Sequence, residues 1–426
     1  MTPSSACFSR RRGACPGLSA PMPTGDGLLV RLQTTGIISL AAFVALCAAA
    51  RRDGNGVVEV TGRGSIQIRG LSVETAPQFA DSVAALAVAA TDGVPVLANP
   101  LAGLDPSEFL DTGAVAADIR GAITDAGLAA KLAPKVSVTV DGGGSLTLDD
   151  IAADVRLRAE RMDGAIGLRV SVGGTAADAT ELGTVAPADG VEAAIRLLEM
   201  IARFGHTARA RDILAAGGTA PLRSAIADLL TAAPPATALA ASHVIGTHRL
   251  RDGLACGIGL AFGHAEATAL ERLTVSAATA GATGIGTAGR ALLVIGVPAQ
   301  AMPALLRDAA GLGFIANGND PRRHVIACSG APICASGYVA TRALAPAIAD
   351  VAAASSNETL IHVSGCAKGC AYSSKATLTV VGTPAGCALI AAGSVNDTPF
   401  AMIPVEDLPA AVARYVRKAF REGSHV

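Results

Sequence analysis

An internal repeat constrains the fold of this chain of 426 residues more than any other sequence feature. Three short stretches recur further along with nearly the same spacing: Asp26-Gly27-Leu28 as Asp252-Gly253-Leu254, Gly62-Arg63 as Gly289-Arg290, and Gly70-Leu71 as Gly296-Val297. Self-similarity at one long spacing indicates a duplicated structural unit. The sequence therefore predicts two copies of one unit in series.

The repeat continues into the later part of each copy. Pro100-Leu101-Ala102-Gly103 falls opposite Cys328-Ser329-Gly330-Ala331, and Val140-Asp141-Gly142 falls opposite Ser364-Gly365-Cys366. We therefore expect candidate metal ligands in the second copy only. Pro234-Pro235, in an Ala/Thr-rich stretch between the copies, is the predicted linker.

Hydrophobic periodicity predicts both strands and helices within each copy. Alternation with period two predicts strands over residues 28–32, 57–61, 65–69, 136–140 and 360–363. Ala-rich periodic stretches predict helices over residues 106–131 and 338–354. The first copy's strand 136–140 ends in a glycine-rich turn, whereas strand 360–363 of the second copy ends in a cysteine-containing loop.

Length and charge limit the classes of function. Domains usually hold about 100 to 200 residues, so we expect about two to four of them. With 34 basic and 35 acidic residues, the global balance favours neither nucleic acid nor an anionic membrane as a partner. The longest apolar run, Gly36 to Ala50, is shorter than the roughly 20 residues of a spanning helix and predicts a buried amphipathic helix. No secretory segment follows Arg10–Arg12, so we expect a cytoplasmic protein.

Four cysteines form two closely spaced pairs, which is typical of metal ligands. Cys328 and Cys334 enclose five residues, and Cys366 and Cys370 enclose three. Four thiolates suit an iron–sulfur cluster or zinc. Structural zinc usually has pairs that enclose two to four residues, so the wider pair favours a cluster, with a zinc module as the alternative. No role is assigned to the isolated cysteines: Cys7, Cys15, Cys47, Cys256 and Cys387.

The two pairs, in this order, resemble the cluster motif of the sirohaem-dependent nitrite and sulfite reductase superfamily. The resemblance covers almost the whole chain and implies an α+β fold, with a pseudo-two-fold duplication of a ferredoxin-like half-domain and an α/β domain that holds the cluster. It implies half-domains at residues 13–78 and 245–312. The domain at 79–233 would lack cluster ligands, and the domain at 313–426 would hold a 4Fe–4S cluster.

Several passages are similar to the precorrin-3B synthase family within this superfamily. They include Pro21 to Arg31, Arg63 to Leu71 and His362 to Ala371. This resemblance implies an oxygen-dependent monooxygenase of aerobic cobalamin biosynthesis that hydroxylates the tetrapyrrole precorrin-3A at C20 and closes a γ-lactone. It also implies a mononuclear non-haem iron, whose ligands the sequence does not identify, and an external reductase or ferredoxin as electron donor.

A precorrin carries several carboxylates, so its site needs fixed cations. Arg31, Arg63 and Lys135 match anion-binding positions of the reductases and are the first candidates for substrate contacts. Arg69 alternates with Gln67 along one strand face and is a further candidate, as is Arg290, the repeat equivalent of Arg63. Lys368, between two cluster cysteines, is the candidate for orienting a carboxylate or delivering a proton.

Three other functions remain open at this point. The first is a sirohaem nitrite or sulfite reductase, in which Cys370 bridges cluster and sirohaem. The Gly64 that follows Arg63, and the isolated Lys135, depart from the reductase pattern and argue against sirohaem. The second is an electron-transfer protein without substrate chemistry, and the third is a zinc-stabilised module.

Overall fold

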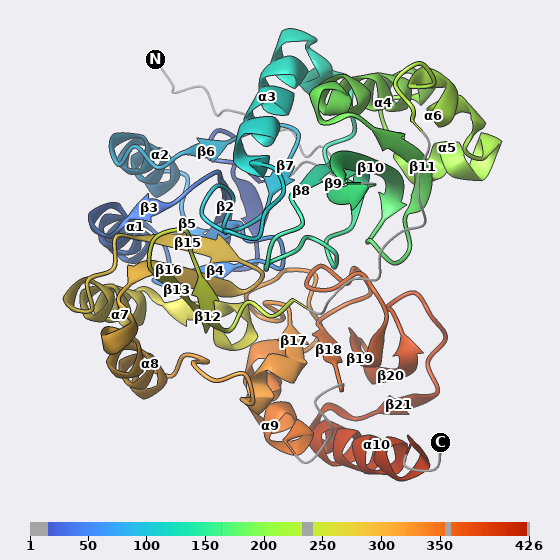
Figure 1. The fold of residues 1–426 in the computed structure, drawn as a ribbon. Coiled ribbons are helices and arrows are strands. Elements are labelled where there is room, and N and C mark those ends of the chain that lie inside the picture. Colours follow the sequence, from blue (N-terminus) through green and yellow to red (C-terminus); the bar gives the residue numbers. More distant parts are fainter. Residues whose placement is uncertain (1–15, 163, 232–241, 354–358, 424–426) are drawn as a thin grey trace, which may run out of the picture. The chain divides into compact units, whose positions relative to one another are not determined.

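The computed structural model describes residues 16–162, 164–231, 242–353 and 359–423 (Figure 1). The chain forms two compact units. Among the described residues, one unit comprises Pro16, Asp92–Gly103 and 107–231, and the other comprises Gly17–Thr91, Leu104–Pro106, 242–353 and 359–423. We call these the small and the large unit.

The large unit begins with a sheet built mainly by the first copy of the repeat. Its order is β1 (Met22–Thr24), β2 (Gly27–Thr34), β5 (Ile66–Leu71), β4 (Val57–Val60) and β14 (His264–Glu266), with β6 (Ala90–Thr91) also paired to β2. The accompanying helices are α1 (Leu40–Asp53) and α2 (Thr75–Ala85). The Ser39 side chain accepts a hydrogen bond from the Ala42 amide and caps α1.

The second copy builds an equivalent sheet in the same unit. Its order is β12 (Gly246–Arg249), β13 (Leu254–Gly259), β16 (Ala291–Val297), β15 (Gly284–Ala288) and β3 (Ile38–Ser39), with helices α7 (Ala267–Thr279) and α8 (Met302–Gly311). The short strand before each long helix crosses to the other sheet. Thus β3 of the first copy pairs with β15, and β14 of the second copy pairs with β4.

One hydrophobic core joins these two sheets. Helices α1, α2, α7 and α8 lie along one side of the sheets (Figure 1). Alternation places Val30, Leu32, Ile66 and Ile68 in this core, together with Phe43 of α1. The polar residues between them therefore face away from the helices, and this opposite face carries the candidate site.

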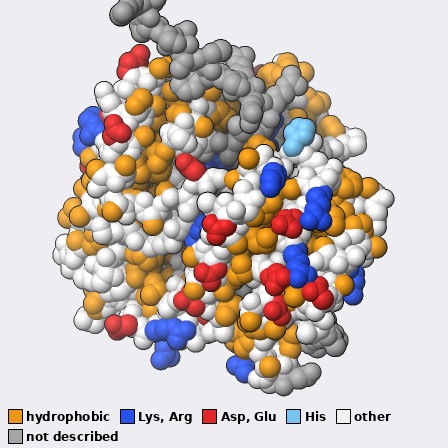
Figure 2. Space-filling view, turned by 90° about the horizontal axis from the view of Figure 1, so that it is seen from above, with side chains coloured by type: hydrophobic (Ala, Val, Ile, Leu, Met, Phe, Trp, Pro, Cys, Tyr) orange, Lys and Arg blue, Asp and Glu red, His pale blue; other side chains and the backbone are white. Residues whose placement is uncertain are grey.

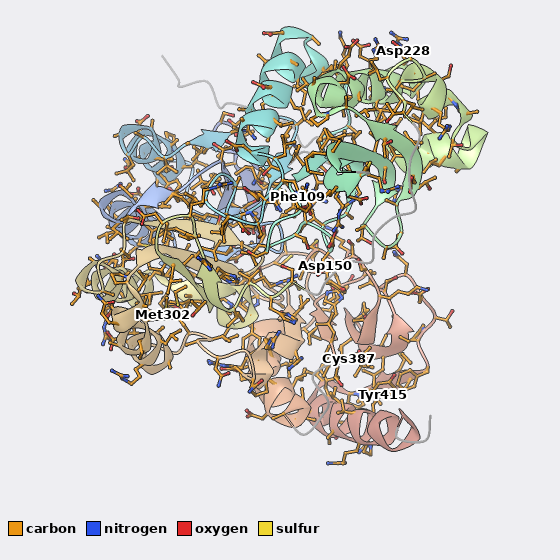
Figure 3. All side chains as sticks on the ribbon, in the orientation of Figure 1. Phe109, Asp150, Asp228, Met302, Cys387 and Tyr415 are labelled. Carbon is orange, nitrogen blue, oxygen red and sulfur yellow. The ribbon has the colours of Figure 1, made fainter. Side chains whose placement is uncertain are left out.

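A second core in the large unit holds the cysteine loops. Its sheet runs β17 (Val325–Ala327), β18 (Ile361–Ser364), β19 (Ala376–Thr383), β20 (Gly386–Gly393) and β21 (Ala401–Ile403), flanked by α9 (Thr341–Ala352) and α10 (Leu408–Gly423). The pairs β17–β18 and β18–β19 are parallel, and the remaining pairs are antiparallel. Cys387 of β20 and Tyr415 of α10 both belong to this part of the chain (Figure 3).

The small unit repeats this arrangement. Its sheet runs β7 (Val96–Ala98), β8 (Val138–Asp141), β9 (Ala153–Met162), β10 (Ala165–Gly174) and β11 (Thr180–Val185), with helices α3 (Thr112–Asp125), α4 (Gly190–Phe204), α5 (Ala210–Gly217) and α6 (Ala220–Ala225). Here too, β7–β8 and β8–β9 are parallel and the later pairs are antiparallel. The duplicated α+β fold is therefore confirmed.

Short 3-10 helices complete the fold: η1 (Leu128–Ala130), η2 (Pro187–Asp189), η3 (Ala261–Gly263), η4 (Ala299–Ala301), η5 (Pro321–His324) and η6 (Val405–Asp407). The helix expected over 106–131 is thus α3 followed by η1. The four domain boundaries stay a prediction. Helix α2 spans the boundary placed after residue 78 and packs Phe79 and Val83 in the first core. The predicted linker Pro234-Pro235 lies outside the described residues.

The structure corrects both later matches of the repeat alignment by one residue. Strand β8 ends at Asp141 and strand β18 ends at Ser364, so Gly142 lies opposite Gly365 and not opposite Cys366. Strand β7 ends at Ala98 and strand β17 ends at Ala327. The residue opposite Cys328 is therefore Asn99, and not Pro100 as the sequence match suggested. An Ala/Gly-rich sequence matches itself at neighbouring offsets, so a sequence alignment of the two copies can be displaced by one residue. The ends of equivalent strands define the correct alignment.

Surface charges are mixed. On the face drawn in Figure 2, acidic and basic side chains are interspersed among apolar ones. Within the described residues, none of the helices combines the length and the apolar character needed to cross a bilayer.

Candidate functional site

The two cysteine loops leave the same edge of one sheet. Cys328 directly follows β17, and Cys366 follows β18 after Gly365. Since these strands are parallel, their carboxyl ends meet at one edge. The Cys328 amide donates to the Val363 carbonyl oxygen at 3.2 Å, and the Tyr338 amide donates to the Gly365 carbonyl oxygen at 2.8 Å. The structure therefore brings the two predicted ligand loops together.

A backbone amide is directed at one of the sulfurs. The Gly365 N–H donates to Sγ of Cys328 at 3.1 Å. Such N–H···S bonds stabilise a thiolate and are a common second layer around a metal ligand. Cys328, Cys334 and Cys366 are half-buried and Cys370 is exposed, so none of the four is a fully buried packing residue.

Glycines allow the loops to approach closely. A Cβ at Gly365 would lie 3.1 Å from Cα of Gly330, 3.4 Å from Cα of Gly337 and 3.5 Å from Sγ of Cys328. A Cβ at Gly337 would lie 2.7 Å from the amide nitrogen of Ala331. A side chain at Gly337 or Gly365 would therefore displace neighbouring backbone. We call Gly330, Gly337 and Gly365 the glycine cradle; of the three, Gly365 lies beside the Cys328 sulfur.

The other described cysteines differ in their surroundings. Cys47 and Cys256 are buried in the first core, and burial raises the pKa of each thiol to about 12. Burial also raises the pKa of Cys387. These three are packing residues that remain protonated thiols at neutral pH. Cys7 and Cys15 lie outside the described residues.

The cysteine loops fit an iron–sulfur cluster by their donor set, the amide on Cys328 and the glycine cradle. Each thiolate of a cluster binds a different iron, so the sulfurs need not converge around one point. Among the described residues, no group of three or more His, Cys, Asp or Glu side chains is placed to hold a single metal ion. These residues therefore identify no ligand set for a mononuclear iron.

Two predicted cations contact the cysteine loops. Nζ of Lys368 donates to Oγ of Ser336 at 2.7 Å and so bridges the second loop to the first. Nη2 of Arg290 donates to the carbonyl oxygen of Ala371 at 2.7 Å, one residue after Cys370. Arg290 lies in the turn between β15 and β16 with a positive φ of 58°. The substrate roles predicted for these two residues stay predictions.

A row of polar side chains crosses the first sheet on its outer face. Arg31 of β2 lies opposite Gln67 of β5, Gln67 lies opposite Glu59 of β4, and Glu59 lies opposite His264 of β14. Cross-strand partners share a face of the sheet, so these four side chains form one continuous row. Arg69 follows on the same face, as the alternation predicted.

The centre of this row is a buried ion-pair network. Nε of Arg69 lies 2.6 Å from Oε1 of Glu59, and both residues are only 8% exposed. Arg342, near the start of α9, also pairs with Glu59, and Oγ of Ser329 donates to the same carboxylate at 3.3 Å. Sequence reasoning did not single out Glu59, Ser329 or Arg342. The sequence feature that could have indicated Glu59 is its position as the single acidic residue in the otherwise apolar segment Val57-Val58-Glu59-Val60.

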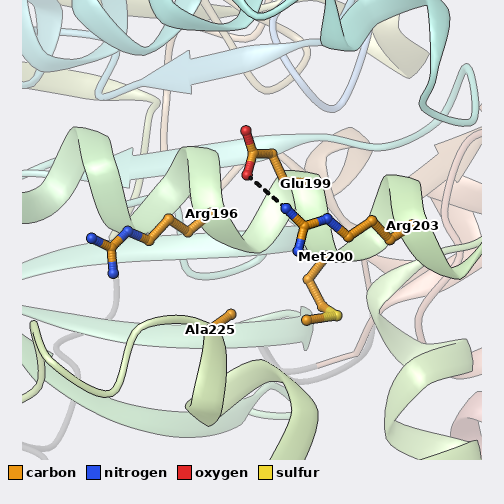
Figure 4. A pocket seen from close by; sticks show the side chains of 5 residues that line it. All are labelled: Arg196, Glu199, Met200, Arg203 and Ala225. Atoms are coloured by element: carbon orange, nitrogen blue, oxygen red, sulfur yellow. Dashed lines mark ion pairs between the residues drawn. The ribbon is translucent and has the colours of Figure 1, made fainter.

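Arg63 and Lys135 are both exposed, in different units. Arg63 occupies the turn between β4 and β5, and Lys135 precedes β8 in the small unit. Their predicted contacts with substrate stay predictions. A surface hollow of the small unit is lined by Arg196, Glu199, Met200, Arg203 and Ala225 (Figure 4). Its two arginines pair with neighbouring carboxylates, so we do not propose them as contacts for substrate carboxylates.

Buried His362 adjoins the second cysteine loop. Its side chain is 0% exposed, and neither ring nitrogen has a hydrogen-bond partner. Its ring meets that of Tyr372 edge-on, with 5.9 Å between centroids. Burial, with a smaller contribution from Arg290, lowers the pKa of His362 to about 4. Burial and Arg342 likewise lower the pKa of His264 to about 4, so both rings are neutral at pH 7.

Comparisons with known proteins agree with this architecture. Residues 20–86 match the family described as the nitrite/sulfite reductase ferredoxin-like half domain. A precorrin-3B synthase from Sinorhizobium sp is 37% identical over 412 residues, covering 96% of this chain and 89% of the relative. A ferredoxin–nitrite reductase from Synechococcus elongatus is 24% identical over 365 residues, covering 76% and 70%. The solved structure of the Mycobacterium tuberculosis NirA protein superposes with a TM-score of 0.77 at 19% identity, covering 92% of this chain and 80% of that one.

Proposed function

Because this chain belongs to the precorrin-3B synthase family, we propose that it is the oxidoreductase that converts precorrin-3A into precorrin-3B in aerobic cobalamin biosynthesis. The reaction hydroxylates C20 and closes a γ-lactone from a ring acetate. One oxygen atom of O₂ enters the product. The other leaves as water after uptake of two electrons and two protons from an external donor.

One observation of the molecule carries this proposal. The outer face of the first sheet, with its row from Arg31 to Glu59, adjoins the cysteine loops through Ser329 and Arg342. A cation-bearing face next to a thiol-rich loop pair suits an anionic tetrapyrrole that receives electrons from a cluster. Arg31 and Arg63 are the proposed carboxylate contacts in this unit, because guanidinium groups bind carboxylates bidentately.

Cys328, Cys334, Cys366 and Cys370 are the proposed ligands of a 4Fe–4S cluster, which would supply electron transfer when bound. The Gly365 amide would stabilise the Cys328 thiolate. Lys368 is the proposed source of a cation or a proton beside the loops, since its ammonium already bridges them at Ser336. The electron donor is proposed to be a separate reductase or ferredoxin.

Anaerobic purification followed by iron, sulfide and zinc analysis tests the cofactor. We expect about four irons per chain on the cysteines, with sulfide in similar amount and without zinc. Turnover of precorrin-3A under ¹⁸O₂ then tests the reaction. We expect one labelled oxygen in the product. Unlabelled product, or unchanged precorrin-3A in the presence of a fully loaded cluster and reductant, would contradict the proposal.

The alternative is a sirohaem-dependent nitrite or sulfite reductase, which the more distant nitrite reductase similarity represents. An optical spectrum separates the two, because sirohaem has strong Soret-type bands and an isolated cluster does not. Sirohaem bands together with nitrite or sulfite turnover would replace the proposed function with this one. Zinc without iron would replace both with a zinc-stabilised module.

A further inference from the structure

Glu59, on the outer face of the first sheet, accepts three hydrogen bonds, and a fourth when the Gln67 amide nitrogen faces it. Its Oε1 accepts from Arg69, Arg342 and Ser329, and its Oε2 faces the side-chain amide of Gln67. Both carboxylate oxygens of Glu59 therefore have a donor, with three donors at Oε1 and one at Oε2. Glu59 is 8% exposed, so water cannot readily replace a lost donor. The positions of the donors around its carboxylate therefore depend on one another.

One side of this arrangement leads to Arg31. The Gln67 amide satisfies both neighbours only when its nitrogen faces Glu59 and its oxygen faces Arg31. In that orientation it donates to Oε2 of Glu59 at 2.9 Å and accepts from Nη2 and Nε of Arg31 at 2.6 and 2.8 Å. The carboxylate thereby determines which end of the amide faces Arg31, and the amide oxygen holds the guanidinium in one place.

The other side leads to the cysteine loops. Ser329 is the residue after Cys328, and Arg342 is the second residue of α9, which begins at Thr341. Oγ1 of Thr341 donates to the Cys328 carbonyl oxygen at 2.5 Å. Glu59 therefore restrains the Cys328 backbone from two directions, through the following residue and through the helix that this threonine begins.

The charges around Glu59 do not balance locally. Two guanidinium groups, Arg69 and Arg342, share one carboxylate, and neutral His264 adds no charge at pH 7. Nη1 of Arg69 and Nε of Arg342 are buried without a hydrogen-bond partner. A site with excess buried positive charge favours additional negative charge nearby, such as an anionic cluster or a substrate carboxylate.

We propose that Glu59 is a positioning residue that couples the substrate cation Arg31 to the cysteine loop at Cys328. Through Gln67 it orients Arg31 toward a tetrapyrrole carboxylate, and through Ser329 and Arg342 it holds the Cys328 loop. This role rests on the proposed function for the identity of the ligand. The family resemblance indicated Arg31 and Cys328 but not Glu59, Ser329 or Arg342, which connect them.

Binding of precorrin-3A to the anaerobic, unreduced holoenzyme tests the first link without turnover. We expect Arg31→Met to weaken binding about tenfold, and we expect the same substitution to weaken it less than threefold in a Glu59→Gln background. Gln67→Leu, which is neutral and similar in volume, is expected to weaken binding as Arg31→Met does. Additive effects of Arg31→Met and Glu59→Gln would overturn the coupling.

The midpoint potential of the iron–sulfur centre tests the second link. Reduction adds negative charge, so loss of a nearby anion raises the potential and loss of a nearby cation lowers it. We expect a higher potential in Glu59→Gln, a lower one in Arg342→Met and an unchanged one in Gln67→Leu. Wild-type potentials in both charge variants would overturn the proposal.

Glu271→Gln is the matched control, because its carboxylate pairs only weakly, at 3.5 Å, with the exposed Arg51. It should leave binding and potential unchanged. Failure of the proposed function would appear differently, as absence of precorrin-3A binding to the wild-type protein. The potentials of Glu59→Gln and Arg342→Met would then still decide whether Glu59 acts on the cysteine loop.

Discussion

The Gly365 amide donates to Sγ of Cys328 at 3.1 Å, and the equivalent Gly142 amide of the other copy donates to Oδ1 of Asn99 at 2.6 Å. Asn99 and Cys328 each follow the first strand of their sheet, and the two glycines each follow the second. The same backbone turn therefore directs its N–H at a sulfur in one copy and at an amide oxygen in the other. The duplicated fold thus provides an equivalent backbone N–H in both copies. The side chain after the first strand, Cys328 or Asn99, determines which atom accepts its hydrogen bond.

In the small unit the asparagine is part of a closed polar network. Nδ2 of Asn99 donates to the Leu146 carbonyl oxygen at 2.7 Å, and Oδ2 of Asp141 accepts from the Leu148 amide at 2.7 Å. Both side chains are at most 5% exposed. This network takes the place of the cysteines and is satisfied within the protein, which explains how the first copy keeps the turn without thiols.

Replacement of a proposed ligand should remove the cluster. We expect Cys366→Ser to lose most of the bound iron and sulfide, because a hydroxyl is a poor substitute for thiolate. Iron and sulfide analysis of anaerobically purified protein measures the loss.

The matched control is Cys387→Ser, which changes a buried thiol of the same sheet. It should keep the iron and lower stability by about 1 to 3 kcal/mol, since a hydroxyl would be buried without an assigned partner. Full iron content in Cys366→Ser would remove this cysteine from the ligand set.

The glycine cradle should be intolerant of a single methyl group. In Gly337→Ala the new Cβ would lie 2.7 and 2.8 Å from backbone atoms of Ala331 and Gly330. The first cysteine loop must then shift, so we expect lower cluster occupancy and a loss of about 1 to 3 kcal/mol. Iron content and thermal unfolding measure both effects.

Gly121→Ala is the control, because Gly121 lies within α3 and its added Cβ would have no atom within 4 Å beyond the local backbone of its own helix. There alanine should raise stability by about 0.5 to 1 kcal/mol. Equal effects of the two substitutions would show that the contacts of Gly337 do not matter.

Arg63 and Arg290 are repeat equivalents that should behave differently. Arg63→Ala is expected to raise KM for precorrin-3A about tenfold with the cluster retained, because one carboxylate contact is lost. Arg290→Met is expected to reduce cluster occupancy, because Arg290 holds the Ala371 carbonyl oxygen beside Cys370.

Iron content and steady-state kinetics of both variants separate these effects. Arg203→Ala serves as the control, since this arginine is 74% exposed and pairs with Glu199 at 3.6 Å. An unchanged KM in Arg63→Ala would exclude Arg63 from the substrate site.

Acid should destabilise the protein through its neutral buried histidines. His264 and His362 have folded-state pKa values of about 4, below the ordinary 6.5. Between these values the unfolded chain binds more protons than the folded one, so stability is full above pH 6.5 and falls as the pH drops toward 4. From about 1.4 kcal/mol per pKa unit, we expect a loss of roughly 1 to 3 kcal/mol per histidine.

Urea unfolding at pH 7 and pH 4.5 measures this dependence in wild type and in His362→Phe. The substitution removes one of the two titrating histidines. The part of the acid-induced loss of unfolding free energy that comes from these histidines should therefore fall by about half. An identical loss in both proteins would mean that His362 does not titrate as its burial indicates.

The sequence by itself determined the elements whose signals are local. Alternation at residues 65–69 identified β5 and placed Gln67 and Arg69 on one face. The repeat at Gly62-Arg63 and Gly289-Arg290 identified the duplication, and the cysteine spacing identified the candidate ligands. These signals depend on the period of a strand and on residue type, and neither requires knowledge of distant contacts.

Only the tertiary structure decided how these side chains are used. Arg69 is paired with Glu59, Arg290 reaches the Ala371 carbonyl oxygen, and Asn99 replaces Pro100 opposite Cys328. The exchange of β3 and β14 between the two sheets was likewise not apparent from the sequence. Each of these depends on strand register and on partners far away in the chain, and the free energy of such contacts is set by the packing of the whole unit, which no local pattern records.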